Sequence, residues 1–146
     1  AQFGLARLAA AAGRRDAALA SLDRIPVSSR AYGEARHKRA VLLSSGLDDD
    51  HALGDLDAAA RELDRTSMDP STIADLRIQI LASALDVVRR RGPAPTTEIG
   101  GVRAEEQPLR HGLEKAYRDA AKLAGTAAER VRLIDLANAV RPRTFV

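Results

Sequence analysis

The sequence contains no cysteine and no tryptophan, and aromatic residues make up only 3% of its 146 residues. Without cysteine there are no disulfides to staple the fold, which suits a cytoplasmic protein. Alanine is the commonest of the residues that make up the 45% hydrophobic share. Alanine is the best helix former but fills little space, so it favours thin helices lying side by side over a sheet covered by helices.

Long hydrophobic runs and a leader sequence are also missing. The richest apolar run, from Ile78 to Val88, is interrupted by Ser83 and Asp86 and is shorter than the roughly 18 residues that a membrane span needs. The start lacks both an initiator methionine and a charged leader, so we expect the chain to begin inside a longer polypeptide. No segment alternates apolar and polar residues at period two, so strand signals are weak.

The charge balance argues for a solvated surface. The chain carries 23 basic and 20 acidic residues, a net charge of +3, and the two signs are interspersed along the sequence. A pI near 9.8 motivates a nucleic-acid-binding module as one alternative. Without a clustered basic stripe, we expect protein partners rather than nucleic acid.

Start and stop signals predict an all-α fold of about seven antiparallel helices in a single domain covering residues 1–146. The signals are glycines after helices, Pro70 in a first turn, and Thr126 with Glu129 as a capping box. The expected helices are Phe3 to Ala12, Ala17 to Arg24, Arg30 to Ser45, Ala52 to Arg65, Ser71 to Arg91, Pro108 to Gly125, and a last one between Thr126 and Pro142.

Two segments stand out within this pattern. The helix from Ser71 to Arg91 is apolar on nearly all sides, so we place it at the centre of the array. Residues 92–107 are rich in proline, glycine and threonine and are predicted to form a long loop, a kind of segment that is functional or mobile when it occurs in a compact domain.

A search for catalytic and ligand-binding groups predicts no catalytic residue, metal site or cofactor site in this chain. A phosphate-binding glycine loop is absent, and His37, His51 and His111 lack metal-ligand spacing. The acids at 48–50 before His51 favour a helix start over a metal site. The arginines at 89–91 suit a helix C-terminus better than an anion site.

Small and large apolar residues recur at the spacings of a tetratricopeptide repeat, in which one helix of each hairpin packs on the other. The first unit carries the pattern as Leu5-Ala6, Ala9, Gly13, Ala18-Leu19, Leu22 and Ile25. A second, from about Ser29 to Asp64, carries an insertion near 46–50. The usual aromatic positions of the repeat pattern are filled by leucine and alanine in this sequence.

The third expected helix offers two polar features. Arg39 falls in the middle of its apolar arc, where it either lays its stem on the core or pairs with an acid from another helix. Arg30 and His37 lie on the opposite arc. The repeat resemblance implies that this arc, with Arg7 from the first helix, lines a protein-binding groove. Ordinary solvated side chains are the alternative.

Both ends of the chain resemble the actinobacterial protein kinase G family. The matching residues are Phe3-Gly4-Leu5-Ala6-Arg7, Ala18 to Ser29, and the ending Leu133-Ile134-Asp135-Leu136-Ala137-Asn138-Ala139-Val140-Arg141-Pro142-Arg143-Thr144. The resemblance implies a serine/threonine kinase with a metal-binding segment, a kinase domain that uses ATP and Mg, and this repeat tail. The tail would support dimerisation and position substrates, while the kinase motifs, absent here, would lie upstream.

The favoured hypothesis is therefore a non-catalytic, cytoplasmic protein–protein interaction and regulatory domain of a bacterial serine/threonine kinase. Its expected partners are the kinase domain of the same chain, a protein substrate or a second copy. An independent helical-repeat adaptor, unrelated to any kinase, is the alternative from another class. Kinase motifs in the gene upstream of Ala1 would separate the two.

Overall fold

The computed structural model describes residues 15–44, 51–65 and 68–143. Their elements are α2 (Arg15–Asp23), α3 (Tyr32–Leu43), α4 (Ala52–Arg65), α5 (Pro70–Arg91), β1 (Ala94–Ile99), β2 (Val102–Ala104), α6 (Glu106–Leu123) and α7 (Ala127–Val140). The predicted all-α repeat architecture is confirmed, and α4 has the predicted bounds. The first expected helix, Phe3 to Ala12, lies outside the described residues.

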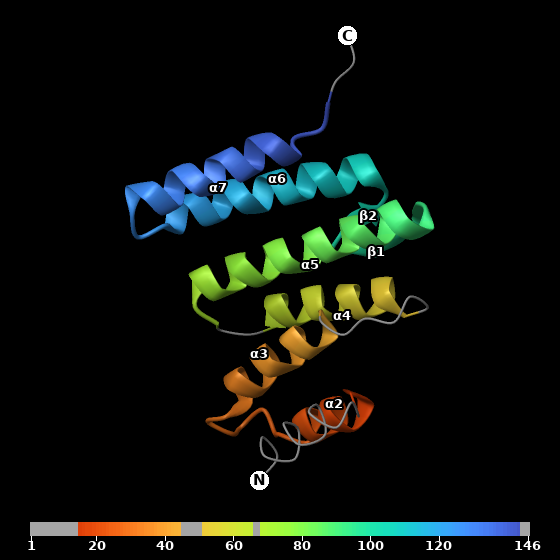
Figure 1. The fold of residues 1–146 in the computed structure, drawn as a ribbon. Helices are drawn as coiled ribbons and strands as arrows, with labels where there is room; N and C mark the ends of the chain where they lie inside the picture. Colours follow the sequence, from red (N-terminus) through yellow and green to blue (C-terminus); the bar gives the residue numbers. More distant parts are fainter. Residues whose placement is uncertain (1–14, 45–50, 66–67, 144–146) are drawn as a thin grey trace.

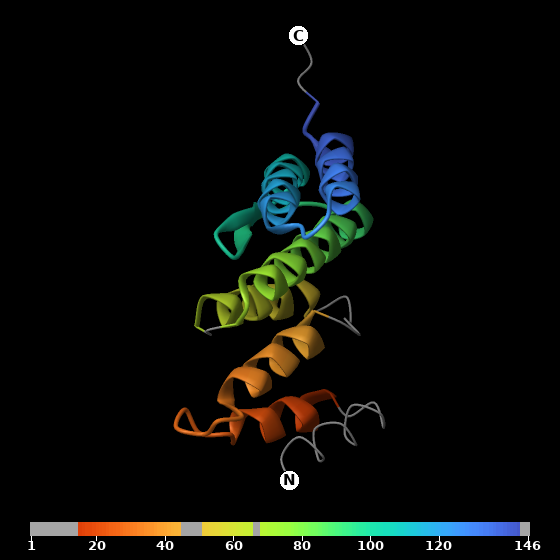
Figure 2. The ribbon, with the colours of Figure 1, turned by 90° about the vertical axis from the view of Figure 1, so that its left-hand side faces the viewer.

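The helices form a stack in which each element packs on the next one along the chain. Figures 1 and 2 show α2 at one end, α7 at the other, and α3, α4, α5 and α6 in order between them. The closest packing joins α6 to α7 and α5 to α6. Contacts between sequence neighbours are typical of solenoid repeats, whose stability is a sum over adjacent units.

The main core is centred on α5, as its apolar circumference predicts. This helix buries residues on several sides and packs against α4, α6 and both strands. Alanines at the helix contacts allow this close packing, because Ala59 and Ala84 are fully buried and Ala116 is 2% exposed. Larger residues then fill the space between the helices: Leu56, Leu63, Ile80, Leu81, Leu85, Leu109 and Leu113.

The segment 92–107, predicted as a long loop, contains an antiparallel β-hairpin instead. Ile99 pairs with Val102 across a turn in which Gly100 and Gly101 have φ values of 56° and 84°. These positive angles suit the tight turns of two-residue hairpins, which favour glycine. Ile99 and Ala104 are almost completely buried, so burial of these two apolar side chains holds the hairpin against the helices.

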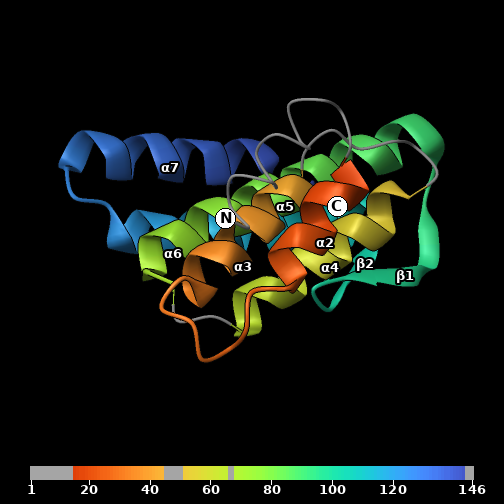
Figure 3. The same ribbon diagram turned by 90° about the horizontal axis from the view of Figure 1, so that it is seen from below.

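Figures 2 and 3 place the hairpin at the side of the stack, next to α5. β1 contacts α4, and β2 contacts α6. The hairpin therefore spans the side of α5 and joins two helices that are not neighbours in sequence.

Side-chain caps fix two helix starts where the sequence predicts them. Asp69 accepts a hydrogen bond from the Ser71 backbone N at 3.1 Å, with Pro70 in the first turn of α5. Thr126 Oγ1 accepts from the Glu129 backbone N at 3.1 Å. The Glu129 carboxylate contacts Arg132 at 2.7 Å, so it also supports the first turn of α7 through an ion pair.

Candidate functional site

Arg30 and His37, two of the three residues predicted to line a groove, do not line the pockets described below. Arg30 is exposed in the turn before α3, and His37 is half-buried on α3. Arg7 lies outside the described residues. The groove that the repeat pattern implies thus stays a prediction.

Arg39 is part of a charged cluster that joins three helices. Its Nε donates to Asp23 Oδ1 of α2 at 2.8 Å, and its Nη1 donates to Glu62 Oε1 of α4 at 3.0 Å. Arg36, one turn earlier on α3, contacts the same Glu62 oxygen at 3.3 Å and lies over the Tyr32 ring. The Glu62 side chain is only 5% exposed. Of the two alternatives stated for Arg39, the structure shows the pairing with acids from other helices, and this cluster joins α2, α3 and α4.

Arg15 makes a second tie that the sequence reasoning missed. Its guanidinium donates to the backbone oxygens of Leu42 and Leu43 at 2.9 Å each, and its Nη1 contacts Asp55 Oδ2 at 2.7 Å. The last carbonyls of α3 lack partners within their own helix, and a cation there is favoured by the helix dipole. No sequence signal pairs Arg15 with a helix end almost thirty residues further on.

The other charged motifs make no ligand site in the described residues. Arg89 contacts Glu106 at 3.5 Å, and Arg90 contacts Asp86 at 3.1 Å, which fits the helix-end interpretation of that cluster. Among the residues described, no group of three or more histidines or acids could hold a metal ion. The acids at 48–50 lie outside these residues.

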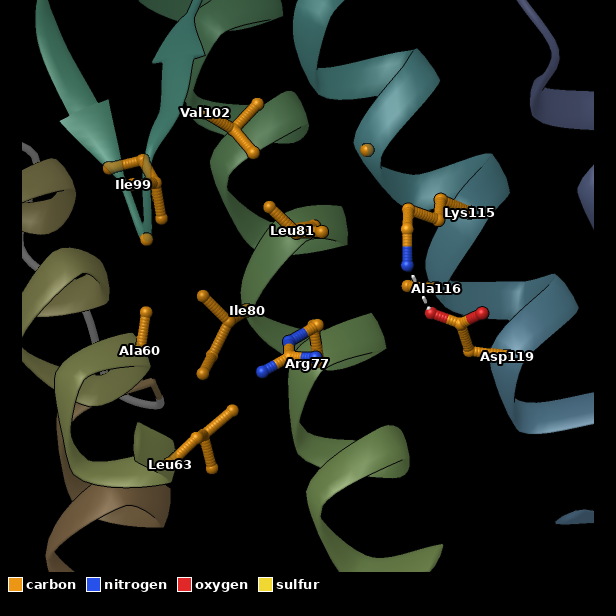
Figure 4. A pocket seen from close by; sticks show the side chains of 12 residues that line it. Ala60, Leu63, Arg77, Ile80, Leu81, Ile99, Val102, Lys115, Ala116 and Asp119 are labelled. Atoms are coloured by element: carbon orange, nitrogen blue, oxygen red, sulfur yellow. Dashed lines mark hydrogen bonds and ion pairs between the residues drawn. The ribbon is translucent and has the colours of Figure 1, made fainter. Parts of the chain in front are cut away.

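A hollow lies where α4, α5, α6 and the hairpin meet (Figure 4). We call it the interhelix cleft. Its volume is about 210 Å³, and its apolar lining comes from all four elements: Ala60, Leu63, Ile80, Leu81, Ile99, Val102 and Ala116. Arg77, Lys115 and Asp119 add charges to the lining.

The charges of the interhelix cleft are largely balanced by their own neighbours. Lys115 Nζ lies 2.6 Å from Asp119 Oδ2, and Figure 4 shows this pair across one turn of α6. Arg77 lies 3.9 Å from Asp64 on α4. The cleft is therefore apolar, and the charges at its edge largely offset one another.

A second, more polar hollow lies between α4 and β1, and we call it the hairpin pocket. It has a volume of about 640 Å³ and is lined by Asp57, Arg61, Asp64, Pro95, Thr96, Glu98, Gly100 and Gly101. Three carboxylates face one guanidinium, so the lining carries a net charge of two negative units. The Asp64 side chain is 73% exposed, and Glu98 is exposed as well.

Gly100 lines both hollows. Its backbone N donates to Asp57 Oδ1 at 3.0 Å, which fastens the hairpin turn to α4. A Cβ at this position would lie 3.0 Å from Ala60 Cβ, so the turn approaches α4 closely. The interhelix cleft and the hairpin pocket are therefore adjacent hollows that share this turn. We call them together the recess, of which one part is apolar and the other acidic.

This arrangement can bind a side chain by shape and charge. Enzymatic sites instead bring together groups poised for proton transfer or nucleophilic attack. Among the described residues, the carboxyl groups with shifted pKa values lie away from the recess, at the starts of α5 and α7. The Ser71 hydroxyl, followed in effect by the backbone amides of Ser71 and Thr72, lowers the pKa of Asp69, and the hydrogen bond from Arg132 lowers that of Glu129.

Within the part of the chain described here, no helix is long and apolar enough to cross a membrane. Two curated relatives cover almost the whole chain. A serine/threonine-protein kinase PknG from Mycolicibacterium smegmatis is 36% identical in an alignment of 145 positions that covers 96% of this chain and 18% of that protein. Its namesake from Mycobacterium leprae is 34% identical over 143 residues, 97% of this chain and 19% of that protein.

The chain thus spans less than a fifth of the length of these relatives. The family model described as protein kinase G tetratricopeptide repeat matches residues 1–144. The helical stack agrees with that description, and the match extends over the hairpin as well as the helices. The chain belongs to the protein kinase G tetratricopeptide repeat family.

Proposed function

We propose that this chain is the non-catalytic interaction and regulatory domain of a bacterial serine/threonine protein kinase. One observation carries the proposal: a match over almost the whole chain corresponds to less than a fifth of two relatives named as kinases. ATP and Mg would then be used by the rest of the parent polypeptide. We expect the protein to work in the cytoplasm.

The mechanism follows from the fold. A helical stack holds extended surfaces in fixed positions, so a repeat tail can present a partner or a second copy to a kinase domain. The charged cluster around Glu62 and the tie made by Arg15 join α2, α3 and α4, which supports this rigid role. Affinity would come from shape and charge, and the catalytic groups from elsewhere in the parent.

Dimerisation is one route by which the domain would regulate the kinase. Leu123 at the end of α6 and Val131 and Ile134 on α7 are large apolar side chains that are 49%, 58% and 36% exposed. Val131 and Ile134 are three residues apart and share one helix face. An apolar face on the last helix of the stack suits contact with another protein surface, since an uncovered stack end is usually polar.

The test begins with the coding sequence upstream of Ala1, which should contain the glycine-rich loop, the ATP-pairing lysine and the catalytic-loop aspartate of a kinase. The parent should then phosphorylate its protein substrate with lower kcat/KM when residues 1–146 are removed. Light scattering should show loss of any dimer. An upstream region without kinase motifs would overturn the proposal in favour of an independent adaptor.

A further inference from the structure

We propose that the interhelix cleft and the adjacent hairpin pocket bind an extended peptide segment in which an apolar and a basic side chain are two residues apart. This inference rests on the proposed function, because it names the chemistry of a partner that such an interaction domain takes. It assigns the site to α4, α5, α6 and the hairpin, apart from Arg30 and His37 on the α3 side.

The volume of the interhelix cleft sets the size of the first side chain. At about 210 Å³ it is smaller than the ~300–1,000 Å³ of small-molecule sites. An apolar cavity of ~150 Å³ is large enough for a benzene molecule. The cleft therefore fits one leucine-sized or phenyl side chain, with Ile80, Leu81 and Ala116 among its apolar contacts.

The negative charge of the hairpin pocket determines the sign of the charge on the second side chain. Asp57 is engaged by Arg61 at 2.5 Å and by the Gly100 amide, so its charge is partly used within the fold. Asp64 and Glu98 are more exposed and lie on opposite walls, one on α4 and one on β1. A lysine or arginine side chain between these walls would meet negative charge on both sides, whereas an acidic side chain would be repelled.

The helical geometry of α4 sets the spacing. Ala60 and Leu63 line the cleft, while Asp57, Arg61 and Asp64 line the hairpin pocket, so the two parts follow adjacent stripes of one helix. Neighbouring positions on a helix surface lie ~5–6 Å apart. In an extended peptide, side chains two residues apart lie on the same face at ~6–7 Å. The two spacings are similar, so side chains two residues apart suit the neighbouring stripes of α4.

Opposing charges leave this preference intact. Lys115 and Arg77 near the cleft are close to Asp119 and Asp64 respectively, and Arg61 is held by Asp57. Asp64 thus has one partner at 3.9 Å, beyond hydrogen-bond distance, and most of its side chain faces solvent. Glu98 lies opposite Arg103 in the hairpin register, and Arg103 also contacts Glu105 at 3.5 Å. Glu98 is the acid on the β1 wall and is the test position.

The experiment is a titration of the ¹⁵N-labelled chain with the blocked peptide Gly-Ser-Leu-Ser-Lys-Ser-Gly, followed by amide chemical shifts. Saturable shifts are expected at Gly100 and at Gly112, which line the recess. Replacing the peptide lysine by glutamate should weaken binding about fivefold, the size of an exposed ion pair. Replacing its leucine by alanine should weaken binding about tenfold, because the buried apolar area is lost.

A matched pair of protein variants completes the test. Glu98→Lys should reduce the preference for the lysine peptide over the glutamate peptide to about equal or below. Asp135→Lys makes the same charge change on an exposed position of α7 and should leave the preference unchanged. Equal binding of the lysine and glutamate peptides to the unaltered chain, shifts confined to other surfaces, or no shifts would each overturn the inference.

The peptide result is separable from the proposed function. If the parent kinase loses substrate phosphorylation without this domain while the peptide fails to bind, only the recess inference falls. If the peptide binds as expected but the region upstream of Ala1 encodes no kinase, only the kinase assignment falls.

Discussion

At the scale of single residues, Glu62 stands out because its charged side chain is buried. Its carboxylate is almost buried between Arg36 and Arg39 and links α4 to α3, and through Arg39 to Asp23 of α2. Removing one partner of a buried ion pair is costly because the remaining charges stay desolvated. Here Arg36 and Arg39 would lose the buried carboxylate that they share, and Asp23, whose side chain is 46% exposed, would still contact both guanidinium groups.

We therefore expect Glu62→Ala to lower the free energy of unfolding by about 2–3 kcal/mol, less than the full cost of an uncompensated buried charge because both arginines reach solvent in part. The measurement is urea unfolding followed by helical circular dichroism. Asp64→Ala is the control, since its exposed, 3.9 Å pair with Arg77 should change stability by less than about 0.5 kcal/mol. Equal losses in the two variants would contradict this account of the cluster.

Asp69 gives a prediction for the pH dependence of stability. Hydrogen bonds from Ser71 lower its pKa below the ordinary 3.8. A lowered native pKa favours folding at any pH above the unfolded value, and this contribution disappears as pH falls through the native pKa. Below about pH 4 the cap on α5 should therefore weaken progressively.

Asp69→Asn keeps a good N-cap residue but removes the titrating group. Its melting temperature should fall less steeply than that of the unaltered chain between pH 4 and pH 2.5. Asp69→Ala should instead lower the melting temperature across the whole range, because the cap is lost at every pH. Parallel melting curves for the asparagine variant and the unaltered chain would show that Asp69 makes no acid-dependent contribution.

At the scale of elements, the helices were predictable and the hairpin was not. Leucine and alanine stripes, Pro70 and Thr126 are local signals, and they placed α4 to α7 close to their observed bounds. The hairpin consists of short strands with few β-branched residues in alternation, and the register shift between Ala94 and Glu98 breaks its period. Its strands are held by the burial of Ile99 and Ala104 against the helices, and this burial cannot be predicted from the local sequence pattern.

The recess was missed for a related reason. Its lining comes from four elements, and each contributes residues that read as ordinary core or surface positions in sequence. Only the approach of Gly100 to α4 joins them. Arg39, by contrast, was recognisable from sequence. A charged residue in an apolar arc either lays its stem on the core or pairs with an acid from another helix, and Arg39 does the second.

The hairpin turn offers a test with its own internal control. Gly100→Ala and Gly101→Ala both place alanine at positive φ, which costs about 1 kcal/mol each. Only the Gly100 substitution puts a Cβ 3.0 Å from Ala60, while the same substitution at Gly101 meets open space. We expect Gly100→Ala to be the more destabilising by about 1 kcal/mol in urea unfolding.

The double variant Ala60→Gly with Gly100→Ala removes the crowding and keeps the backbone strain. A double-mutant cycle should thus recover the extra loss at Gly100, after correction for the glycine placed within α4. Amide exchange of Gly100, whose N–H is held by Asp57, should rise in the single variant and fall back in the double. No coupling in the cycle would mean that the turn tolerates the added methyl group by moving.

At the scale of the whole molecule, contacts run mainly between sequence neighbours, so stability should be distributed along the stack. The smaller apolar clusters lie near its two ends. One contains Leu22, 1% exposed, with Ala18, Ile25 and Ala35; the other contains Leu133, 6% exposed, with Ala74, Ala120 and Ala121. The main cluster around α5 lies between them.

Because the clusters are separate, a substitution in one of them should destabilise only the helices around it. Leu22→Ala and Leu133→Ala each remove a buried leucine, at a local cost of about 2–5 kcal/mol. Hydrogen exchange should accelerate in α2 and α3 for the first variant and in α6 and α7 for the second, with the α5 core protected in both. A uniform rise along the chain in either variant would mean that the stack unfolds as a single cooperative unit. Opening at the α2 end would leave α4, α5, α6 and the hairpin in place around the recess, whereas opening of α6 and α7 would loosen the wall that α6 contributes.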